Sequence, residues 1–129
     1  MKRKFFIVSM LTIGLFLGVF GFNDASLAAN HNFFFDFSER AYTADKPKYS
    51  KSSVYIRSNY MVGGGAFSAY VTLRDRSRIG PSKAVYLNKD VYLTNYAVET
   101  YGSGVRVRVQ GSSPPDGVRN ASGRWRPDL

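Results

Sequence analysis

Apolar and polar side chains alternate along two neighbouring stretches, residues 54–62 and 66–74, which give the clearest structural signal in the chain. A period of two with one apolar and one polar face is typical of strands in a half-buried sheet. The two stretches are joined by three consecutive glycines, 63–65, and glycine readily adopts the positive φ angles of turns. We therefore predict an antiparallel β-hairpin over residues 54–74.

The predicted hairpin assigns each side chain to one of two faces. The face that we expect to be buried contains Val54, Ile56, Ser58, Tyr60, Val62, Phe67, Ala69, Val71 and Leu73. The face that we expect to meet solvent contains Tyr55, Arg57, Asn59, Ser68, Tyr70, Thr72 and Arg74. The solvent face therefore combines tyrosine rings with guanidinium groups.

Three further stretches follow the pattern of strands with one apolar face. They are 33–37, with Phe33, Phe35 and Phe37 on one side; 105–110, with valines opposite Arg106, Arg108 and Gln110; and 118–125, which contains the only tryptophan. Residues 85–87 and 91–93 both read Val-Tyr-Leu and form either a hairpin or two strands that pass between sheets. Residues 38–53 show neither helical nor strand periodicity and contain Pro47, so we expect a loop that crosses between sheets or a short irregular element.

Composition favours an all-β fold. The chain after residue 28 has about one hundred residues, which is enough for one domain. The chain contains no cysteine, so the core must stabilise the fold without disulfides. All 9 tyrosines lie in this part, and aromatic residues favour pleated, half-buried surfaces. We predict a single antiparallel β-sandwich of about six to eight strands over residues 29–129.

The first 28 residues have the pattern of a signal peptide. Residues 2–4 are basic, residues 5–22 are apolar, and small residues follow, so we expect cleavage after Ala28 or Ala29. The alternative is a retained N-terminal membrane anchor, because an apolar run of about 18 residues is at the lower limit for spanning a bilayer. In both cases we predict that the remaining domain is exported and lies outside the cell.

Charge indicates an anionic partner. The full chain has a formal net charge of +9 at pH 7. Removal of residues 1–28 takes away Lys2, Arg3, Lys4 and Asp24, so the remaining domain has a net charge of +7. A small exported domain of this charge is attracted to anionic surfaces, so we predict anionic cell-envelope polymers or lipids as partners. The alternative is that the charge serves solubility alone. Residues 74–78 form a charged turn, whose three guanidiniums would suit phosphate or carboxylate if they act as a patch.

We place the candidate binding site on outward tyrosines and arginines, namely Tyr55, Arg57, Tyr70, Arg74, Arg106 and Arg108. Tyrosine rings would stack on sugars while arginines contact acidic groups. The same combination suits nucleic acid, but an exported protein seldom meets nucleic acid and we expect no such partner. Cross-strand Tyr–Arg pairs also cover an exposed sheet without any ligand, which is the alternative interpretation.

Few residues suit catalysis. His31 is the only histidine and follows the predicted cleavage site, where chain ends are usually mobile. The lack of cysteine excludes Cys nucleophiles and Cys/His zinc sites, and the glycines at 63–65 lack the Lys-Ser/Thr of a phosphate loop. We therefore predict a protein that is not an enzyme and has no cofactor. The alternative is an extracellular hydrolase of cell-wall polysaccharide that uses Glu99 or Glu39.

Several features together resemble a family of small secreted proteins of Gram-positive bacteria. They are the signal peptide, the early Asn-rich aromatic strand, the segment Asn95 to Glu99 and the terminal Ser122-Gly123-Arg124-Trp125-Arg126-Pro127-Asp128. Members of that family have no assigned function and end in a Gly-x-Trp-Ser-Pro-Asp-type tail, whereas position 126 is Arg here. The layout is also similar to that of lactococcin 972-type bacteriocins. These resemblances imply a bacterial exported protein with a β-sandwich, and they carry over no catalytic residue.

The sequence thus predicts a secreted, cationic, non-enzymatic β-domain that acts at the anionic cell envelope, either bacteriocin-like or envelope-associated. The polysaccharide hydrolase described above is the alternative. A third hypothesis is a structural component that self-associates through the edge strand at 33–37, because exposed strand edges pair with other chains.

Overall fold

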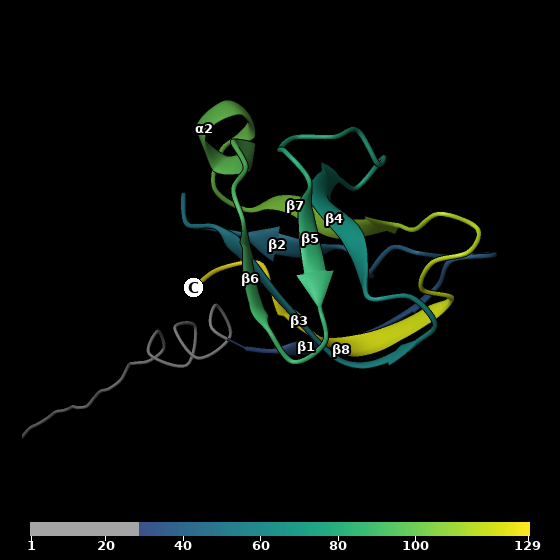
Figure 1. Ribbon diagram of the computed structural model, residues 1–129. Coiled ribbons are helices and arrows are strands. Elements are labelled where there is room, and N and C mark those ends of the chain that lie inside the picture. The colour runs from purple at the N-terminus through teal and green to yellow at the C-terminus, as the bar shows by residue number, and fades with distance from the viewer. Residues whose placement is uncertain (1–28) are drawn as a thin grey trace, which may run out of the picture.

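The computed structural model describes residues 29–129, so the predicted signal peptide lies outside the described residues. The described elements are β1 (His31–Asp36), β2 (Lys46–Lys48), β3 (Val54–Val62), β4 (Ala66–Leu73), β5 (Lys83–Tyr86), β6 (Asp90–Leu93), α2 (Ala97–Tyr101), β7 (Val105–Ser112) and β8 (Asn120–Arg126). The strands form two four-stranded antiparallel sheets, ordered β1-β8-β3-β6 and β2-β7-β4-β5 (Figure 1). The prediction of an all-β antiparallel fold is confirmed.

The two sheets pack face to face around one apolar core, to which both contribute aromatic and branched side chains. Val107 and Val109 of β7 are fully buried, as the alternation in residues 105–110 predicts, whereas Arg106 is exposed. Trp125 of β8 is 1% exposed, so the end of the chain is held in the core. Burial of apolar surface, worth about 25 cal/mol per Å², stabilises the domain without disulfides.

The predicted hairpin over residues 54–74 is wrong. β3 pairs with β6 and β8 in one sheet, whereas β4 pairs with β5 and β7 in the other. The glycines therefore link the two sheets, and Gly64 packs so closely on the β7–β8 loop that a Cβ there would lie 2.5 Å from the Val118 nitrogen. Gly63 and Gly64 do have positive φ angles, of 78° and 50°. The local pattern does not distinguish a hairpin turn from a turn between sheets, because both need the same backbone freedom.

A β-bulge in β3 changes which side chains of its second half face the core. The register between β3 and β8 shifts between Ser58 and Tyr60, which leaves Asn59 as the extra residue. Beyond the bulge, Met61 packs against the core and Tyr60 is 53% exposed, contrary to the predicted alternation. Gly123 of β8 lies opposite the bulge, where a Cβ would collide with the backbone of β3.

Residues 41–48 run along β7 at the sheet edge, where a loop or irregular element is predicted. The Thr43 N–H donates to the Val109 carbonyl oxygen, and β2 continues this pairing. Pro47 is tolerated because β2 is an edge strand. Lys48 is fully buried, which the polar composition of this stretch does not indicate. The predicted passage from one sheet to the other is confirmed, since β1 and β2 lie in different sheets.

The remaining elements close the sandwich. β5 and β6 belong to different sheets, which confirms the second alternative for the two Val-Tyr-Leu stretches. The helix α2 is not predicted from the sequence, and it lies at the same end of the molecule as the C-terminus (Figure 1). His31 lies in β1 with its ring centroid 5.8 Å from that of Trp125, and therefore does not form a free chain end.

Candidate functional site

The candidate binding residues fall on opposite sides of the sandwich. They divide into Tyr55 and Arg57 on β3, and Tyr70, Arg74, Arg106 and Arg108 on or directly after β4 and β7. β3 belongs to one sheet and β4 and β7 to the other, so the two groups point away from each other. The predicted surface that combines both halves of a hairpin is therefore not formed. The structure does bring Arg74, Arg106 and Arg108 together.

These three arginines meet at the carboxylate of Asp45, which directly precedes β2. Arg106 donates from Nε to Asp45 Oδ2 and from Nη2 to the Asp45 carbonyl oxygen. Arg74 Nε lies 3.6 Å from Oδ2, and Arg108 Nη2 lies 3.5 Å from Oδ1. The hydrogen bond from Arg106 is the main reason that the pKa of Asp45 is lowered, so this carboxylate is ionised at neutral pH.

Tyr42 forms a second centre on the same surface. Its backbone bridges to Gln110 of β7, which places Tyr42 beside the outer face of this sheet. The guanidinium carbons of Arg40, Arg76 and Arg108 lie 4.7, 4.4 and 5.0 Å from the Tyr42 ring centroid. Cation–π attraction holds the groups on the ring, while their like charges repel one another. An anion bound among them would reduce this repulsion.

The charged turn after β4 folds back along the sheet and extends this surface. The Leu73 N–H donates to the Ser77 carbonyl oxygen, and Arg78 bridges to Thr72. The Arg78 guanidinium lies 4.5 Å from the Tyr70 ring centroid. Thr72 is fully buried even though it lies on the outward side of the alternation, because Arg78 and Arg108 flank it on the neighbouring segments.

We call this surface the arginine face, and it consists of Arg40, Arg74, Arg76, Arg78, Arg106, Arg108, Tyr42, Tyr70 and Asp45. The Arg74 side chain is 72% exposed and that of Arg106 is 45% exposed, so both guanidiniums are open to a ligand. Arg108 Nε is buried without a hydrogen-bond partner among residues 29–129. Oriented guanidiniums of this kind suit phosphate and carboxylate groups, which they bind in a bidentate manner.

Tyr55 and Arg57, the two predicted binding residues on β3, are already in contact with neighbouring side chains. Tyr55 is 5% exposed, and the prediction that it meets solvent is wrong. The Arg126 guanidinium lies 4.5 Å from its ring centroid, and the Tyr92 ring packs at 5.7 Å. The Tyr55 hydroxyl and Arg57 Nη1 both donate to Asp90 Oδ1, at 2.7 and 2.9 Å. Because Tyr55 and Arg57 already form hydrogen bonds with Asp90, we place the candidate site on the opposite sheet.

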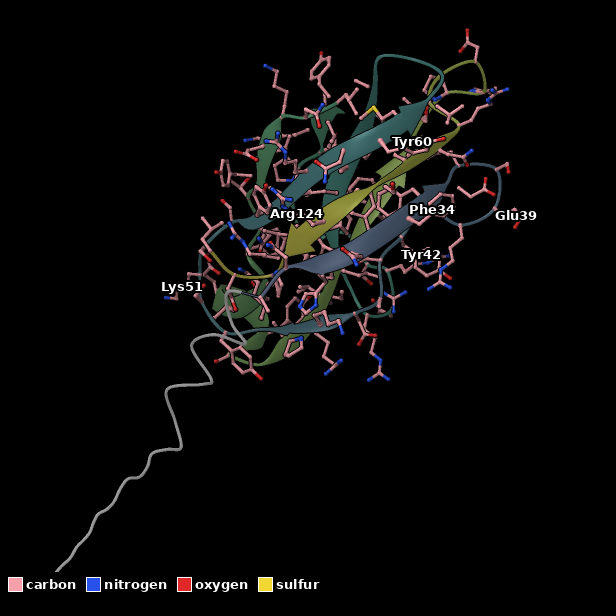
Figure 2. The ribbon with its side chains drawn as sticks, turned by 90° about the horizontal axis from the view of Figure 1, so that it is seen from below. Phe34, Glu39, Tyr42, Lys51, Tyr60 and Arg124 are labelled. Carbon is pink, nitrogen blue, oxygen red and sulfur yellow. The ribbon has the colours of Figure 1, made fainter. Side chains whose placement is uncertain are left out.

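The carboxylates of the predicted hydrolase alternative lie at opposite ends of β7. Glu39 lines a hollow beside Gln110, near the end of β7, and Figure 2 shows it at one end of the sandwich. Glu99 lies in α2, and its charge acts on Lys48, which pairs with Val105 at the start of β7. The strand between these points spans about 16 Å, at roughly 3.3 Å per residue. Catalytic carboxylate pairs of glycosidases lie about 5–10 Å apart, so Glu39 and Glu99 do not pair with each other, and a hydrolase that uses either one of them remains a prediction.

Two features are absent from the part of the chain that the structure describes. Residues 29–129 contain no group of three or more His, Cys, Asp or Glu side chains that could hold a metal ion. Over the same range, no helix has the length and apolar character needed to cross a membrane.

The family model described as Protein of unknown function (DUF2712) matches residues 22–129. The chain belongs to the DUF2712 family. The expectation of a family without an assigned function is confirmed, and the DUF2712 match includes the whole arginine face and the terminal segment after β8. Gram-positive origin and similarity to lactococcin 972-type bacteriocins remain predictions. No curated protein and no solved structure matches the chain.

The part of the arginine face that lies within residues 38–53 is not predicted from the sequence. Arg40, Tyr42 and Asp45 lie there, and their only signal is the short alternation of Ala41, Tyr42 and Thr43. Three residues are too few to establish a strand period. The three arginines of the turn at 74–78 do stand out in the sequence, which predicts that they would suit phosphate or carboxylate if they act as a patch.

Proposed function

We propose that this DUF2712 protein is a secreted, cationic, non-enzymatic β-domain that binds anionic polymers or lipids of the cell envelope through its arginine face. The observation that carries the proposal is the stacking of Arg40, Arg76 and Arg108 around the Tyr42 ring. Export, which the pattern of residues 1–28 indicates, would bring this face to the envelope. A bacteriocin-like role and an envelope-associated role both need such contact.

The strength of binding would come from several weak contacts made together. A single exposed ion pair contributes at most about 1 kcal/mol, but neighbouring guanidiniums engage successive charges of one polymer. Arg74 and Arg106 are both open to solvent, so salt screens their contacts. The screening length falls from about 10 Å at 0.1 M salt to about 3 Å at 1 M. Binding through this face should therefore be released by salt.

Co-sedimentation tests this function directly. We expect the purified protein to sediment with isolated cell walls or phosphatidylglycerol vesicles at about 0.1 M salt and to be released at about 1 M. The variant Arg76→Gln/Arg78→Gln should bind weakly, because it removes guanidiniums from Tyr42 and Tyr70. Lys51→Gln/Lys89→Gln is the matched control, since both lysines are exposed and the charge change is the same. Salt-independent binding, or equal loss in the two variants, would contradict the proposal.

A further inference from the structure

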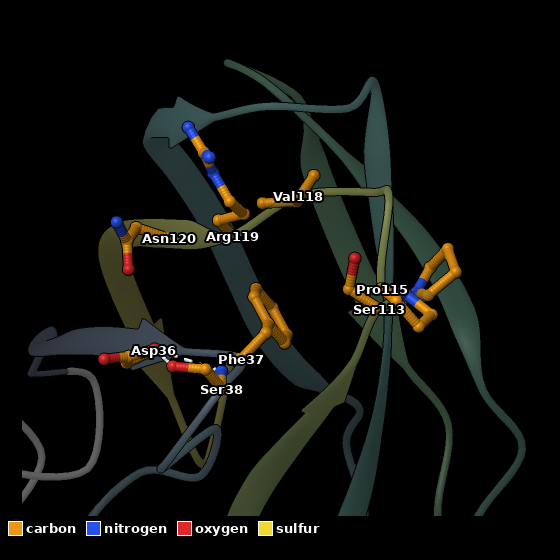
Figure 3. A pocket seen from close by; sticks show the side chains of 9 residues that line it. Asp36, Phe37, Ser38, Ser113, Pro115, Val118, Arg119 and Asn120 are labelled. Atoms are coloured by element: carbon orange, nitrogen blue, oxygen red, sulfur yellow. Dashed lines mark hydrogen bonds between the residues drawn. The ribbon is translucent and has the colours of Figure 1, made fainter.

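A groove at one end of the sandwich leads to the arginine face. It consists of two adjoining hollows, of about 610 Å³ and about 330 Å³, whose walls share Phe37, Ser38 and Ser113. The larger hollow lies between the turn after β1 and the β7–β8 loop, and Figure 3 shows the Phe37 ring pointing into the space between them. The smaller hollow is lined by Tyr42 and Arg76, which also belong to the arginine face.

The side chains along this groove are of the kinds that recognise sugars. Asp36 and Asn120 line the larger hollow, and Glu39 and Gln110 line the smaller one. Carboxylates accept hydrogen bonds, and amides both donate and accept them, as the hydroxyls of a sugar require. The Phe37 ring offers an apolar surface for the C–H face of a sugar ring. The groove thus combines an apolar platform with short polar groups on both sides.

Two groups in the groove have hydrogen-bonding capacity that the described residues do not use. The Ser113 hydroxyl oxygen is buried and has no partner within residues 29–129, which is rare in folded proteins. Asp36 is held in place by Ser38, whose hydroxyl and N–H donate to Oδ1 at 2.7 and 3.0 Å. These bonds lower the pKa of Asp36, so it is an acceptor at neutral pH. Asp36 lines the β1 side of this hollow and Ser113 lines the side of the β7–β8 loop.

We propose that this groove binds a linear anionic polysaccharide, with sugar rings in the two hollows and phosphate or carboxylate substituents on the arginine face. The inference rests on the proposed function, because it takes the arginine face as the anion site. Arg119 lines the larger hollow and Arg76 lines the smaller one, so each hollow has a cation in its wall. A lipid acyl chain would instead suit another hollow, which Leu73, Tyr101 and Val105 line together with Arg74, Asp75 and Arg106.

The double variant Ser113→Ala/Asn120→Ala tests the groove in the full chain. Calorimetric titrations would use an oligogalacturonate as the anionic glycan and inorganic polyphosphate as an anion without sugar. We expect the variant to bind oligogalacturonate about tenfold more weakly, because it loses two hydrogen-bonding groups. It should bind polyphosphate within about twofold of the unaltered protein, since the arginines are untouched. Its Tm should be retained, because the Ser113 hydroxyl bonds to none of the described residues.

Ser82→Ala/Asn32→Ala is the matched control, since both side chains are exposed and lie outside the groove. If Ser113→Ala/Asn120→Ala melts early, Gln110→Ala in the smaller hollow provides a second test with the same expectation. The groove proposal is overturned if the variants bind oligogalacturonate normally, or if the unaltered protein binds only polyphosphate or phosphatidylglycerol vesicles. Those outcomes leave the arginine face intact. Failure to bind any of the three probes would overturn the proposed function as well.

Discussion

Lys48 and Asp128, which are 80 positions apart in the sequence, form an ion pair inside the protein, with Nζ 3.2 Å from Oδ1. The Lys48 side chain is 0% exposed and that of Asp128 is 3% exposed. Lys48 also donates to the Pro127 carbonyl oxygen at 2.7 Å, and Asp128 accepts from the Tyr49 and Ser50 N–H groups at 3.0 Å each. These contacts hold the C-terminal segment against residues 48–50 at the end of β2.

Asp128→Ala should destabilise the protein strongly. Removal of one partner leaves the Lys48 ammonium buried without its counter-charge, which typically costs about 3–5 kcal/mol. The double variant Lys48→Met/Asp128→Ala should cost less, because no charge remains buried. Urea denaturation of both variants measures the free energies of unfolding. A loss below about 1 kcal/mol for Asp128→Ala would show that this pair does not hold the segment.

Acid should weaken the same contact. Burial disfavours the Asp128 carboxylate, but hydrogen bonds from Ser50 and Tyr49 outweigh this effect and hold its pKa below 3.8. Because the folded pKa is lower than the unfolded one, the stabilisation is present above about pH 4 and is lost as the pH falls through the folded pKa. The free energy of unfolding should therefore fall more steeply below about pH 4 in the unaltered protein than in Asp128→Ala. Parallel pH profiles would argue against this role.

The link between the sheets should tolerate a side chain at Gly65 but not at Gly64. Gly64→Ala places a Cβ 2.5 Å from the Val118 nitrogen at a φ of +50°, and we expect a loss of about 2–4 kcal/mol. Gly65→Ala is the control, because a Cβ there has nothing within 4 Å, and we expect a change below about 0.5 kcal/mol. Thermal unfolding of both variants measures the difference. Equal Tm values would indicate that the link does not pack on the β7–β8 loop.

Asp45→Asn should strengthen anion binding. Asp45 competes with any ligand for Arg74, Arg106 and Arg108, so its neutralisation frees these guanidiniums. We expect the affinity for polyphosphate to rise about three- to tenfold, with little change in stability. Asp116→Asn carries the same charge change on an exposed loop and should have a much smaller effect. Titration calorimetry distinguishes the two, and weaker binding by Asp45→Asn would mean that the carboxylate organises the site.

The core-facing side of β7 could be predicted from the sequence, because no irregularity interrupts this strand. The valines of β7 alternate without a break, and Val107 and Val109 are buried as predicted. In β3 the extra residue Asn59 shifts the alternation, and no residue type there marks a bulge. The pairing of β3 and β4 with other strands depends on contacts distant in sequence, which the local pattern of residues 54–74 does not contain.

The same limit applies to the candidate site. Arg106 and Arg108 were predicted on the outward face of one strand, and the structure places them there beside Arg74. Tyr42 could not be assigned, because its role depends on the edge pairing of a stretch without strand periodicity. The burial of Lys48 could not be predicted either, because it depends on the carboxylate of Asp128 at the far end of the chain.

The most direct test of the arginine face is a nuclear magnetic resonance titration of the protein with inorganic polyphosphate. Backbone amide and arginine Nε–H signals report where an added anion binds. We predict saturable shifts concentrated in residues 40–45, 70–78 and 106–110, which contain the arginine face. Shifts concentrated on the opposite sheet around Arg57 and Arg126, or no saturable shifts, would contradict the account.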